Sequence, residues 1–375
     1  MNANAQRIRE YLLAYYPADE WPTLLQQANE WAATQPLAGL RVLDATPIYR
    51  NTLGKFMALL AAGAEVYVPR RTAMPQDAAT FERLADFGIH IAEKEQNDFD
   101  IILDCAAQCS RYTPALGYAE LTRSGVSVYE RARRPVIVAD AGRIKRVETT
   151  LGTGESFFRA LHQLGYSELA GTRLIVVGYG KVGSGLVHYA RKQGMKVTVA
   201  DLENKAGSLP DDVTFINVNN RAELNAAVLD AWCVVTATGR INALHNRLDA
   251  HAVVASPVLL ANMGIEDEFG TKIPNHRVLN NKKPLNFILA EPTRMCFIET
   301  TLALHNACAL ELLTADLPAV CMPPAPDVEE RLLHIATTQG CDELRQWIDK
   351  LGSSKNSINE NLSESTIYNL QSTKC

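Results

Sequence analysis

One glycine-rich stretch has the residue types and the spacing of a nucleotide-binding turn. It reads G-x-G-x-x-G and comprises Gly178, Tyr179, Gly180, Lys181, Val182 and Gly183. The apolar run Arg173–Val177 precedes it, a predicted helix follows it, and Asp201 ends the next apolar run about 20 residues further on. In such a turn the first glycine permits the tight bend, the second lets the backbone approach a pyrophosphate, and the third allows close helix packing. The free N–H groups at the start of the helix attract phosphates, so the stretch predicts a dinucleotide site.

Asp201 indicates which dinucleotide the turn would hold. A carboxylate at the end of this strand can accept hydrogen bonds from the ribose hydroxyls and repels a 2′-phosphate, so NAD is favoured over NADP as the cofactor. Two later strand-end turns could line the nicotinamide end of the same crevice. They contribute Thr236, Ala237, Thr238 and Gly239 after the expected strand Trp232–Val235, and Asn262 after the expected strand Ala252–Ala255 and the segment Pro257–Leu260. The alternative interpretation of both is an ordinary turn without a ligand.

The elements that must position these residues alternate between strands and helices. Residues 1–36 have apolar positions at helical spacing, and Pro22 suits the first turn of a second helix. Apolar, β-rich runs typical of buried parallel strands recur at Arg41–Ala45, Glu65–Val68, Ile101–Leu103, Val136–Ala139, Arg173–Val177 and Lys196–Ala200. Helical runs are expected at Thr52–Ala62, Leu186–Gln193 and Thr301–Leu313. The order strand, turn, helix, glycine, strand occurs twice, which predicts two related α/β units.

We therefore predict an α/β fold with two Rossmann-like doubly wound domains. The first, the substrate-binding and catalytic domain, would comprise residues 1–150 and receive the helices of residues 306–352. Residues 151–305 would form the NAD-binding domain, inserted before that C-terminal helical return. Residues 353–375 are rich in Ser and Asn and are expected to be a disordered tail.

Composition narrows the class of protein further. The chain has 375 residues, 47% of them hydrophobic, with a net charge of −5 and a pI of about 6.0. This balance disfavours a nucleic-acid binder or a polybasic membrane-surface protein. No apolar run suits a transmembrane helix, and the first residues lack the apolar core of a signal peptide, so we expect a cytoplasmic protein. The eight cysteines form no C-x-x-C pair and no zinc-like cluster, which indicates reduced thiols and no metal site.

With these pieces in order, the chain resembles the S-adenosylhomocysteine hydrolase family. The resemblance rests on the glycine turn, Asp201, the Thr-Ala-Thr-Gly and Asn-Met-Gly turns, and the stretches Gly39–Val68, Ile101–Asp104 and Leu289–Glu291. It is closest in the cofactor half. It implies tightly held NAD that oxidises a substrate hydroxyl transiently, so that the neighbouring C–H becomes acidic and a thiol is eliminated. It also implies a nucleoside pocket with a Lys and acid/base groups around the oxidised carbon.

The catalytic positions of the family are only partly kept. The family's catalytic Lys matches Lys145, and its Leu-Asp-Asp run keeps one carboxylate, Asp104. The Asp and Asn that follow the Lys are Thr149 and Thr150 here, and we expect both on the cofactor side. The threonine triplet that touches NAD is replaced around Glu130, the third acid/base candidate. We expect desolvation in a closed cleft to lower the pKa of Lys145 and to make it the proton-transfer partner; an ordinary surface lysine is the alternative.

Other family positions are lost. The catalytic His of the N-terminal domain falls on Pro47, and the His-Phe-Asp hinge motif reads Ile265-Glu266-Asp267. The Gly-His-Pro segment is absent, and the C-terminal Lys and Tyr that reach a neighbouring subunit's NAD have no counterpart. The pattern indicates a relative that keeps NAD and acts on a different substrate. His305 and His251 are candidate acid/base groups, although a lone His on an apolar helix is more often structural.

The replacement residues indicate a small polar or anionic substrate. Those predicted to bind it follow the strand Arg41–Ala45 or the Ala-Glu-Pro turn: Tyr49, Arg50, Asn51, Thr52 and Arg294. Further arginines follow Glu130, namely Arg131, Arg133 and Arg134. Guanidinium groups pair bidentately with carboxylates and phosphates, so a cleft with several of them suits such a substrate. For any single arginine, a surface charge is the alternative.

Three functions stay open at this level. The first is an NAD-dependent enzyme acting by hydride transfer, the second is adenosylhomocysteine hydrolysis with substitute residues, and the third is a non-catalytic NAD-binding regulator. Retention of Lys145 argues against the third. The expected partners are a small-molecule substrate and a second copy of the chain, in a homodimer formed through the cofactor domains. Neither nucleic acid nor a membrane is expected.

Overall fold

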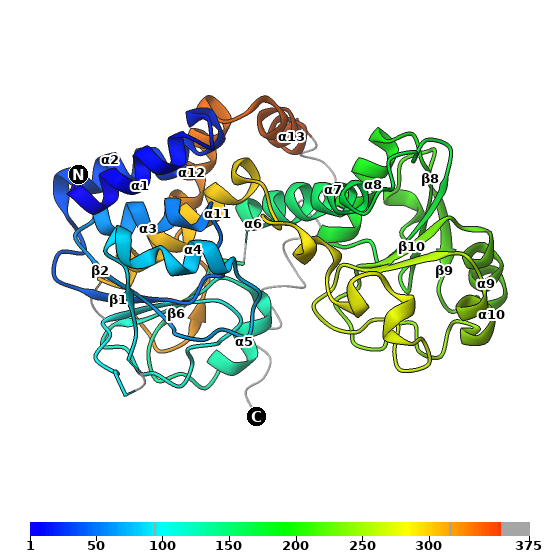
Figure 1. Ribbon diagram of the computed structural model, residues 1–375, viewed down its shortest axis with the longest axis horizontal. Coiled ribbons are helices and arrows are strands. Elements are labelled where there is room, and N and C mark those ends of the chain that lie inside the picture. The colour runs from blue at the N-terminus through cyan, green and yellow to red at the C-terminus, as the bar shows by residue number, and fades with distance from the viewer. Residues whose placement is uncertain (94, 141, 315–316, 354–375) are drawn as a thin grey trace.

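Two parallel β-sheets, one in each half of the molecule, organise the structure (Figure 1). It is a computed structural model that describes residues 1–93, 95–140, 142–314 and 317–353. The N-terminal half holds the first sheet, and the half at the right of Figure 1 holds the second. All the strand pairs of the two sheets are parallel. This confirms the α/β fold class and the doubly wound architecture.

The first sheet has seven strands in the order β12-β6-β5-β4-β1-β2-β3. They are β1 (Arg41–Asp44), β2 (Glu65–Val68), β3 (His90–Ile91), β4 (Ile101–Asp104), β5 (Gly117–Glu120), β6 (Val136–Val138) and β12 (Cys321–Met322). The central strands are apolar and buried on both faces, as parallel strands between helical layers must be. The strand order reverses between β1 and β4, so the loops after these two strands diverge and leave a crevice at their carboxyl ends.

The second sheet has five strands in the order β11-β10-β7-β8-β9. They are β7 (Arg173–Val177), β8 (Lys196–Asp201), β9 (Thr214–Asn217), β10 (Cys233–Thr236) and β11 (Leu259–Asn262). Its order reverses between β7 and β10, in the same way as the first sheet reverses between β1 and β4. The two sheets therefore repeat one topology, as the repeated order in the sequence predicts.

Thirteen α-helices of the described residues accompany the sheets. They are α1 (Ala3–Leu13), α2 (Pro22–Thr34), α3 (Thr52–Ala61), α4 (Ala78–Glu82), α5 (Arg123–Tyr129), α6 (Arg143–Val147), α7 (Gly154–Gln163), α8 (Lys181–Lys192), α9 (Arg221–Asp230), α10 (Ala250–Ala255), α11 (Met295–Glu311), α12 (Pro326–Gln339) and α13 (Asp342–Ser353). A π-helical turn, Glu148–Thr153, joins α6 to α7. Pro22 opens α2, as predicted.

Helix α11 is the central helix of the first half. It is buried along most of its length, and it packs against α2, α3 and the strands β4 and β5. Its neighbour α3 is buried along its whole length. Lys55 of α3 is fully buried and forms an ion pair with the equally buried Asp44 at the end of β1. This pair fixes the start of α3 against the sheet, beside the loop that carries the predicted substrate residues.

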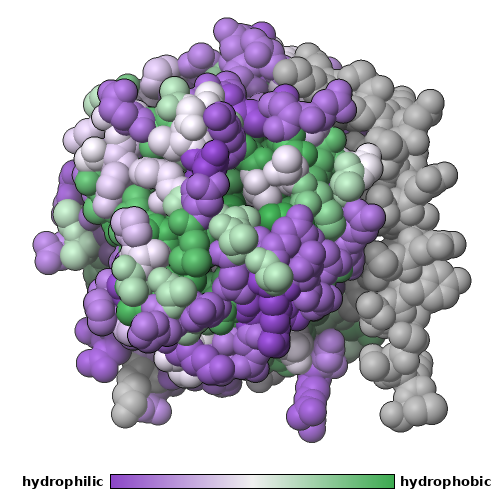
Figure 2. Space-filling view, turned by 90° about the vertical axis from the view of Figure 1, so that its right-hand side faces the viewer, coloured by the Kyte–Doolittle hydropathy of each residue, from purple (hydrophilic) through white to green (hydrophobic). Residues whose placement is uncertain are grey.

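The second half presents a mixed surface to solvent. Figure 2 looks onto the side that is at the right in Figure 1, and it shows hydrophilic residues around areas of hydrophobic ones. Large apolar side chains exposed on this half include Leu164, Leu202, Leu229, Ile241 and Ile265. Among the described residues, no helix is both long enough and apolar enough to cross a membrane.

One element was predicted with the wrong type. Ala252–Ala255 is the end of α10 and not a strand, because Asp249 caps this helix by accepting a hydrogen bond from the Ala252 N–H at 3.1 Å. The strand is β11, which begins at Leu259 within the segment that follows. A short apolar run bounded by polar residues has no periodicity that separates a buried strand from a short helix. The predicted tail after Ser353 lies outside the described residues.

Candidate functional site

The glycine-rich turn joins the end of β7 to the start of α8, in the middle of the second sheet. Gly178 has a φ of +93°, and a Cβ there would lie 2.8 Å from the Ala237 carbonyl oxygen. A Cβ on Gly183 would lie 1.9 Å from the carbonyl oxygen of Gly178, so glycine is what lets α8 start this close to the strand. A Cβ on Gly180 would meet nothing within 4 Å. The turn therefore leaves open space at Gly180, beside the free N–H groups of α8.

Asp201 ends β8 beside this turn. Its Oδ2 accepts a hydrogen bond from the Tyr179 N–H at 2.8 Å, and its Oδ1 accepts one from the Glu203 N–H at 3.2 Å. Each carboxylate oxygen has a second lone pair, so the group can still accept hydrogen bonds from the hydroxyls of a ligand. A cavity of about 380 Å³ opens at this corner, and we call it the cofactor cavity. Its lining includes Gly178, Tyr179, Gly180, Asp201, Ala237, Thr238 and Arg240.

A buried carboxylate that the sequence analysis missed holds the turn after β10. Glu268 accepts hydrogen bonds from the N–H and the hydroxyl of Thr238, both at 2.8 Å, and from the N–H of Gly239 at 2.7 Å. Thr236 and Asn262 are fully buried, and the hydroxyl of Thr236 donates to the amide oxygen of Asn262 at 2.9 Å. These last two residues therefore fix the ends of β10 and β11 and do not line the cofactor cavity.

The cofactor cavity fits a dinucleotide. It lies where the strand order of the second sheet reverses, and open α/β sheets bind their ligands at this point. The open space at Gly180 suits a pyrophosphate, and the carboxylate of Asp201 suits a ribose. In the described part of the chain, no group of His, Cys, Asp and Glu is arranged to hold a metal ion.

A second cavity, of about 390 Å³, lies between the two halves, and we call it the interdomain cleft. Loops after β1, β4 and β5 line it from the first half, and the start of α8 lines it from the second. Four of the predicted substrate and catalytic residues line this cleft: Tyr49, Asn51, Thr52 and Lys145. Three of the predicted cofactor residues also line it: Thr149, Lys181 and Val182. One cavity thus touches both predicted groups.

Lys145 forms a close ion pair in this cleft. Its Nζ lies 2.6 Å from Oε2 of Glu148, and both side chains are nearly buried. Burial lowers the pKa of Lys145, but the negative charges of Glu148 and Asp140 outweigh it, and the pKa lies above its ordinary value. The expected lowering of this pKa is therefore wrong, because the carboxylate of Glu148 lies next to Lys145. Lys145 is positively charged at neutral pH and is set to donate a proton or a hydrogen bond.

A second ion pair crosses the cleft. Lys181, the first residue of α8, has its Nζ 3.2 Å from Oδ2 of Asp140, which follows β6. It connects the glycine turn of the second half to the first half. Thr149 and Thr150 lie at the same boundary between the two halves. Thr149 lines the cleft, and a Cβ on Gly185 of α8 would lie 1.9 Å from the carbonyl oxygen of Thr150. The backbone of Thr150 therefore packs against the cofactor helix, and Thr149 faces the cleft.

The other two predicted acid/base residues lie outside the cleft lining. Asp104 is fully buried and accepts hydrogen bonds from the N–H groups of Cys105 at 2.8 Å and Cys109 at 2.9 Å, and from the hydroxyl of Tyr129. Burial raises the pKa of Asp104 to about 6. Glu130 is exposed at the end of α5. Asp104 organises the turn after β4, and Glu130 faces solvent.

A neighbouring buried glutamate, Glu120, has a structural role beside the cleft. Glu120 lies opposite Asp104 in the register of β4 and β5, and its buried carboxylate accepts the N–H groups of Ala106 at 2.8 Å and Ala107 at 2.9 Å. Both alanines have positive φ, 59° and 53°, and their successive N–H groups bind the Glu120 carboxylate together. Glu120 therefore fixes the turn that brings Cys105 to the cleft wall.

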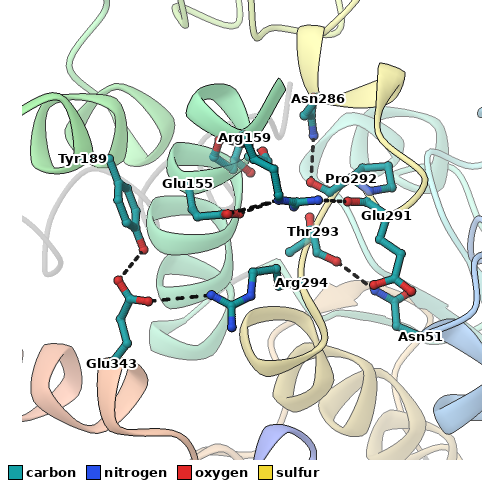
Figure 3. Close-up of polar contacts among 12 residues, drawn as sticks. Asn51, Glu155, Arg159, Tyr189, Asn286, Glu291, Pro292, Thr293, Arg294 and Glu343 are labelled. Atoms are coloured by element: carbon teal, nitrogen blue, oxygen red, sulfur yellow. Dashed lines mark hydrogen bonds and ion pairs between the residues drawn. The ribbon is translucent and has the colours of Figure 1, made fainter. Parts of the chain in front are cut away.

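The predicted substrate residues divide into two groups. Tyr49, Asn51 and Thr52 line the cleft, and the Asn51 amide donates to the Thr293 carbonyl at 2.8 Å (Figure 3). Arg50 instead lies over the ring of Tyr15, with its guanidinium carbon 4.0 Å from the ring centre. Arg294 points toward Glu343 of α13, with their charged atoms 4.0 Å apart. Arg50 and Arg294 therefore make their contacts outside the cleft and do not line it.

The arginines after Glu130 do not reach the cleft, because Arg131, Arg133 and Arg134 are absent from its lining. Arg123, which the sequence analysis did not single out, does line it, directly after Leu121 and Thr122 at the end of β5. The strand β5 was not predicted, and a residue just past its end could not be recognised without it.

The two candidate histidines are also elsewhere. His305 is fully buried in α11, where its Nε2 lies 3.0 Å from the Ala119 carbonyl oxygen. Burial lowers its pKa to about 3, so it is neutral at physiological pH. His251 is exposed on α10. Neither residue lines the cleft.

The fold and the two cavities define a two-domain α/β protein with a dinucleotide-binding half and a cleft between the halves. No family model matches the chain. It is similar to S-inosyl-L-homocysteine hydrolase of Methanopyrus kandleri, at 26% identity over 216 residues, which is 49% of this chain and 51% of the relative. It is similar to the adenosylhomocysteinase of Sulfolobus acidocaldarius, at 24% identity over 252 residues, or 59% of each chain.

These matches confirm the resemblance read from the sequence: the chain is similar to members of the S-adenosylhomocysteine hydrolase family. The matched part of the chain covers between about half and two thirds of the length of these relatives. A third relative, the adenosylhomocysteinase of Thermoplasma acidophilum, is 23% identical over 287 residues, which is 68% of each chain. Among solved structures, a dipicolinate synthase chain from Bacillus halodurans matches with a TM-score of 0.47 and 11% identity, over 75% of this chain and 99% of that one. NAD is the cofactor that the glycine turn and the similarity to the adenosylhomocysteinases support.

Proposed function

We propose that this protein is an NAD-dependent enzyme that acts by hydride transfer on a small polar or anionic metabolite bound in the interdomain cleft. The observation that carries the proposal is the shared lining of this cleft. Lys145, the predicted proton-transfer residue, and Lys181 and Val182, the first residues of the cofactor helix, line one cavity. A substrate beside Lys145 is thereby within reach of a nicotinamide that extends from the glycine turn.

The roles of the chain's own residues follow from their contacts. The N–H groups at the start of α8 would hold the pyrophosphate, and Asp201 would hold the adenosine ribose. NAD, when bound, supplies a hydride acceptor. Lys145 stays charged through its ion pair with Glu148, so it would bind the substrate oxygen and stabilise negative charge on it. Proton transfer through Lys145 would release its proton toward Glu148, its nearest carboxylate.

Arg123 supports the anionic character of the substrate. The cleft lining holds three cations and two carboxylates: Arg123, Lys145, Lys181, Asp140 and Glu148. Each lysine is paired with one of the carboxylates, at 2.6 Å for Lys145 and 3.2 Å for Lys181. Within the described residues, Arg123 has no ion-pair partner. The uncompensated charge of the cleft is therefore positive and lies on a guanidinium, which suits a carboxylate or a phosphate.

The curated relatives favour a second candidate, the hydrolysis of an S-nucleosyl-homocysteine. S-inosyl-L-homocysteine hydrolase and the adenosylhomocysteinases are the relatives named above. Pro47 stands where the family has a catalytic histidine, and among the described residues no histidine lines the cleft. Hydrolysis would therefore have to use other groups of the cleft for proton transfer, with Lys145 and Glu148 as the first candidates. For this reason we place it second.

The experiment that tests the proposal uses purified full-length protein with its nucleotide identified after denaturation. Candidate substrates are added with NAD while the absorbance of reduced nicotinamide is followed. Accumulation of NADH with an anionic secondary alcohol supports net oxidation. Thiol release from S-adenosylhomocysteine or S-inosylhomocysteine without net NADH would establish the second candidate instead. Neither NADH nor thiol from any substrate, with NAD bound, would indicate a non-catalytic NAD-binding regulator.

A further inference from the structure

The charged side chains of the interdomain cleft are gathered on one side of it. Arg123 follows β5, and Asp140 and Lys145 follow β6, the strand that pairs with β5. Glu148 and Lys181 belong to the same group through their ion pairs, at 2.6 Å to Lys145 and at 3.2 Å to Asp140. The charged side of the cleft is therefore the part beside the carboxyl ends of β5 and β6.

The other walls of the cleft receive no charged side chain from the described residues. They come from the loops after β1 and β4, from residues 263–287 of the second half and from residues 292–298. The apolar members of these walls are Pro47, Met263, Ile265, Pro284, Phe287 and Ile298. Of the polar members, the Asn51 amide and the Thr52 hydroxyl already donate to backbone carbonyls, each at 2.8 Å. These walls therefore offer apolar surface to a ligand, and we call them the apolar walls.

Ile265 differs from the rest of the apolar walls because 61% of its surface is exposed. It follows β11 in a loop that Asn262 fixes. The Asn262 amide donates to the carbonyls on both sides of the isoleucine, to Gly264 at 3.0 Å and to Glu266 at 2.7 Å. The same amide also donates to the Lys282 carbonyl at 2.6 Å. The loop therefore holds this apolar side chain at the cleft, where a ligand with an apolar part would remove it from water.

We propose that the substrate of this cleft is an amphiphilic carboxylate, in which the carboxylate is joined to an apolar chain or ring of several carbon atoms. This inference rests on the proposed function, because it names the substrate class of the same site. The carboxylate pairs with the guanidinium of Arg123, and the apolar part covers Ile265 and its apolar neighbours. A substrate rich in hydroxyl groups would leave them unpaired against the apolar walls, and this weakens its binding.

The test measures the binding of a series of straight-chain carboxylates to the full-length protein with NAD added. Calorimetry gives the dissociation constants of acetate, butyrate, hexanoate and octanoate. We expect the affinity to rise about threefold for each added methylene that reaches the apolar walls. Hexanamide has the same chain without the charge, and it should bind at least about tenfold more weakly than hexanoate.

Two variants separate the two parts of the ligand. Arg123→Gln should raise the dissociation constant of every carboxylate about tenfold and leave the dependence on chain length as it is in wild type. Ile265→Asn should leave acetate binding unchanged and reduce the gain for each methylene. The matched control is Leu229→Asn, which changes an exposed apolar residue of α9 that lines neither cavity. This control should change neither quantity.

Two results would overturn the inference. One is equal affinity for acetate and octanoate in wild type, a readout that does not depend on the folding of any variant. The other is an unchanged chain-length dependence in Ile265→Asn, which would place the apolar chain elsewhere. The proposed function fails separately. Oxidation of a polar hydroxy acid without a chain-length effect would refute only this inference, whereas a chain-length effect without NADH from any substrate would refute only the hydride transfer.

Discussion

The Nζ of Lys145 lies 2.6 Å from Oε2 of Glu148, one helical turn further along the chain. Glu148 begins the π-helical turn that separates α6 from α7, and such turns often occur where a side chain is placed for function. Both groups are nearly buried, so their attraction is little screened by water. This pairing keeps Lys145 charged in a site whose burial alone would discharge it.

Replacement of Glu148 should therefore change the titration of Lys145. Glu148→Gln removes the nearest negative charge, and desolvation then lowers the pKa of Lys145 below that in wild type. We expect acetylation of Lys145 by acetic anhydride, followed by mass spectrometry, to begin at a pH that is lower by about one unit or more. Exposed Lys272 provides the control within the same sample. Equal titration of Lys145 in both proteins would show that Glu148 does not set its charge.

Two glycines of the cofactor turn should respond to alanine in opposite ways. A Cβ on Gly183 would overlap the Gly178 carbonyl at 1.9 Å, so Gly183→Ala should lower the free energy of unfolding by about 2 kcal/mol or more. A Cβ on Gly180 would meet no atom within 4 Å, so Gly180→Ala should fold normally and lose at least about tenfold in NAD affinity. Denaturant unfolding and calorimetric titration measure the two quantities. Unchanged NAD affinity in Gly180→Ala would mean that no phosphate lies at this turn.

Asp201 should set both the affinity for NAD and its preference over NADP. Asp201→Asn keeps an acceptor oxygen for the Tyr179 N–H but removes the negative charge. We expect about a tenfold loss of NAD affinity and a smaller ratio between NAD and NADP, because a charged hydrogen bond contributes about 1.5–3 kcal/mol. Asp211→Asn, at an exposed site on the same half, is the control. Equal NAD and NADP affinities in wild type would contradict this role for Asp201.

Arg123 should bind the anionic part of the substrate. Arg123→Gln removes the unpaired charge of the cleft, and Arg133→Gln removes an exposed arginine outside it. With inorganic phosphate as the probe and NAD-saturated protein, we expect about a tenfold higher dissociation constant for the first variant and no change for the second. NAD affinity should be the same in both. A loss of NAD affinity in Arg123→Gln would assign this residue to the cofactor instead of the substrate.

His305 should make the protein sensitive to acid. Burial holds its pKa at about 3 in the folded state, against about 6.5 in the unfolded chain. Between these values the unfolded chain binds a proton that the folded chain does not, so the free energy of unfolding falls as the pH falls. His305→Gln should reduce the difference in this free energy between pH 7 and pH 5 by about 2 kcal/mol. Urea unfolding at both pH values checks it, and an identical pH dependence would show that His305 is charged or flexible in the folded state.

The alternating strands and helices could be predicted from the sequence because most of them depend on local patterns. Buried parallel strands such as β2 and β7 are short apolar runs, and their bounds were predicted correctly. The error at Ala252–Ala255 has the same origin, because a helix held by the Asp249 cap has a similar composition. Strand β5 was missed, since its sequence, Gly117–Glu120, has little β-branched character.

The cleft was harder to predict because the charges of its residues depend on how the local chain folds and on contacts between the two halves. Lys145 was found through a motif, but the direction of its pKa depends on Glu148 and Asp140, and only the fold shows how these two carboxylates surround it. The arginines of the cleft were predicted to be Arg50 and Arg294, with Arg131, Arg133 and Arg134 as further candidates, whereas Arg123 lines it. Local spacing identified the glycine turn, since all its parts lie on one strand–turn–helix unit.

The central claim, that the second half binds NAD next to a cleft containing Lys145, is tested most directly by titrating nucleotide-free protein with NAD in a calorimeter. We expect one NAD per chain, a dissociation constant lower than that for NADP, and protection of Lys145 and Lys181 from acetylation when NAD is present, while Lys272 stays reactive. Absence of binding, or binding that leaves Lys145 and Lys181 as reactive as before, would contradict the account.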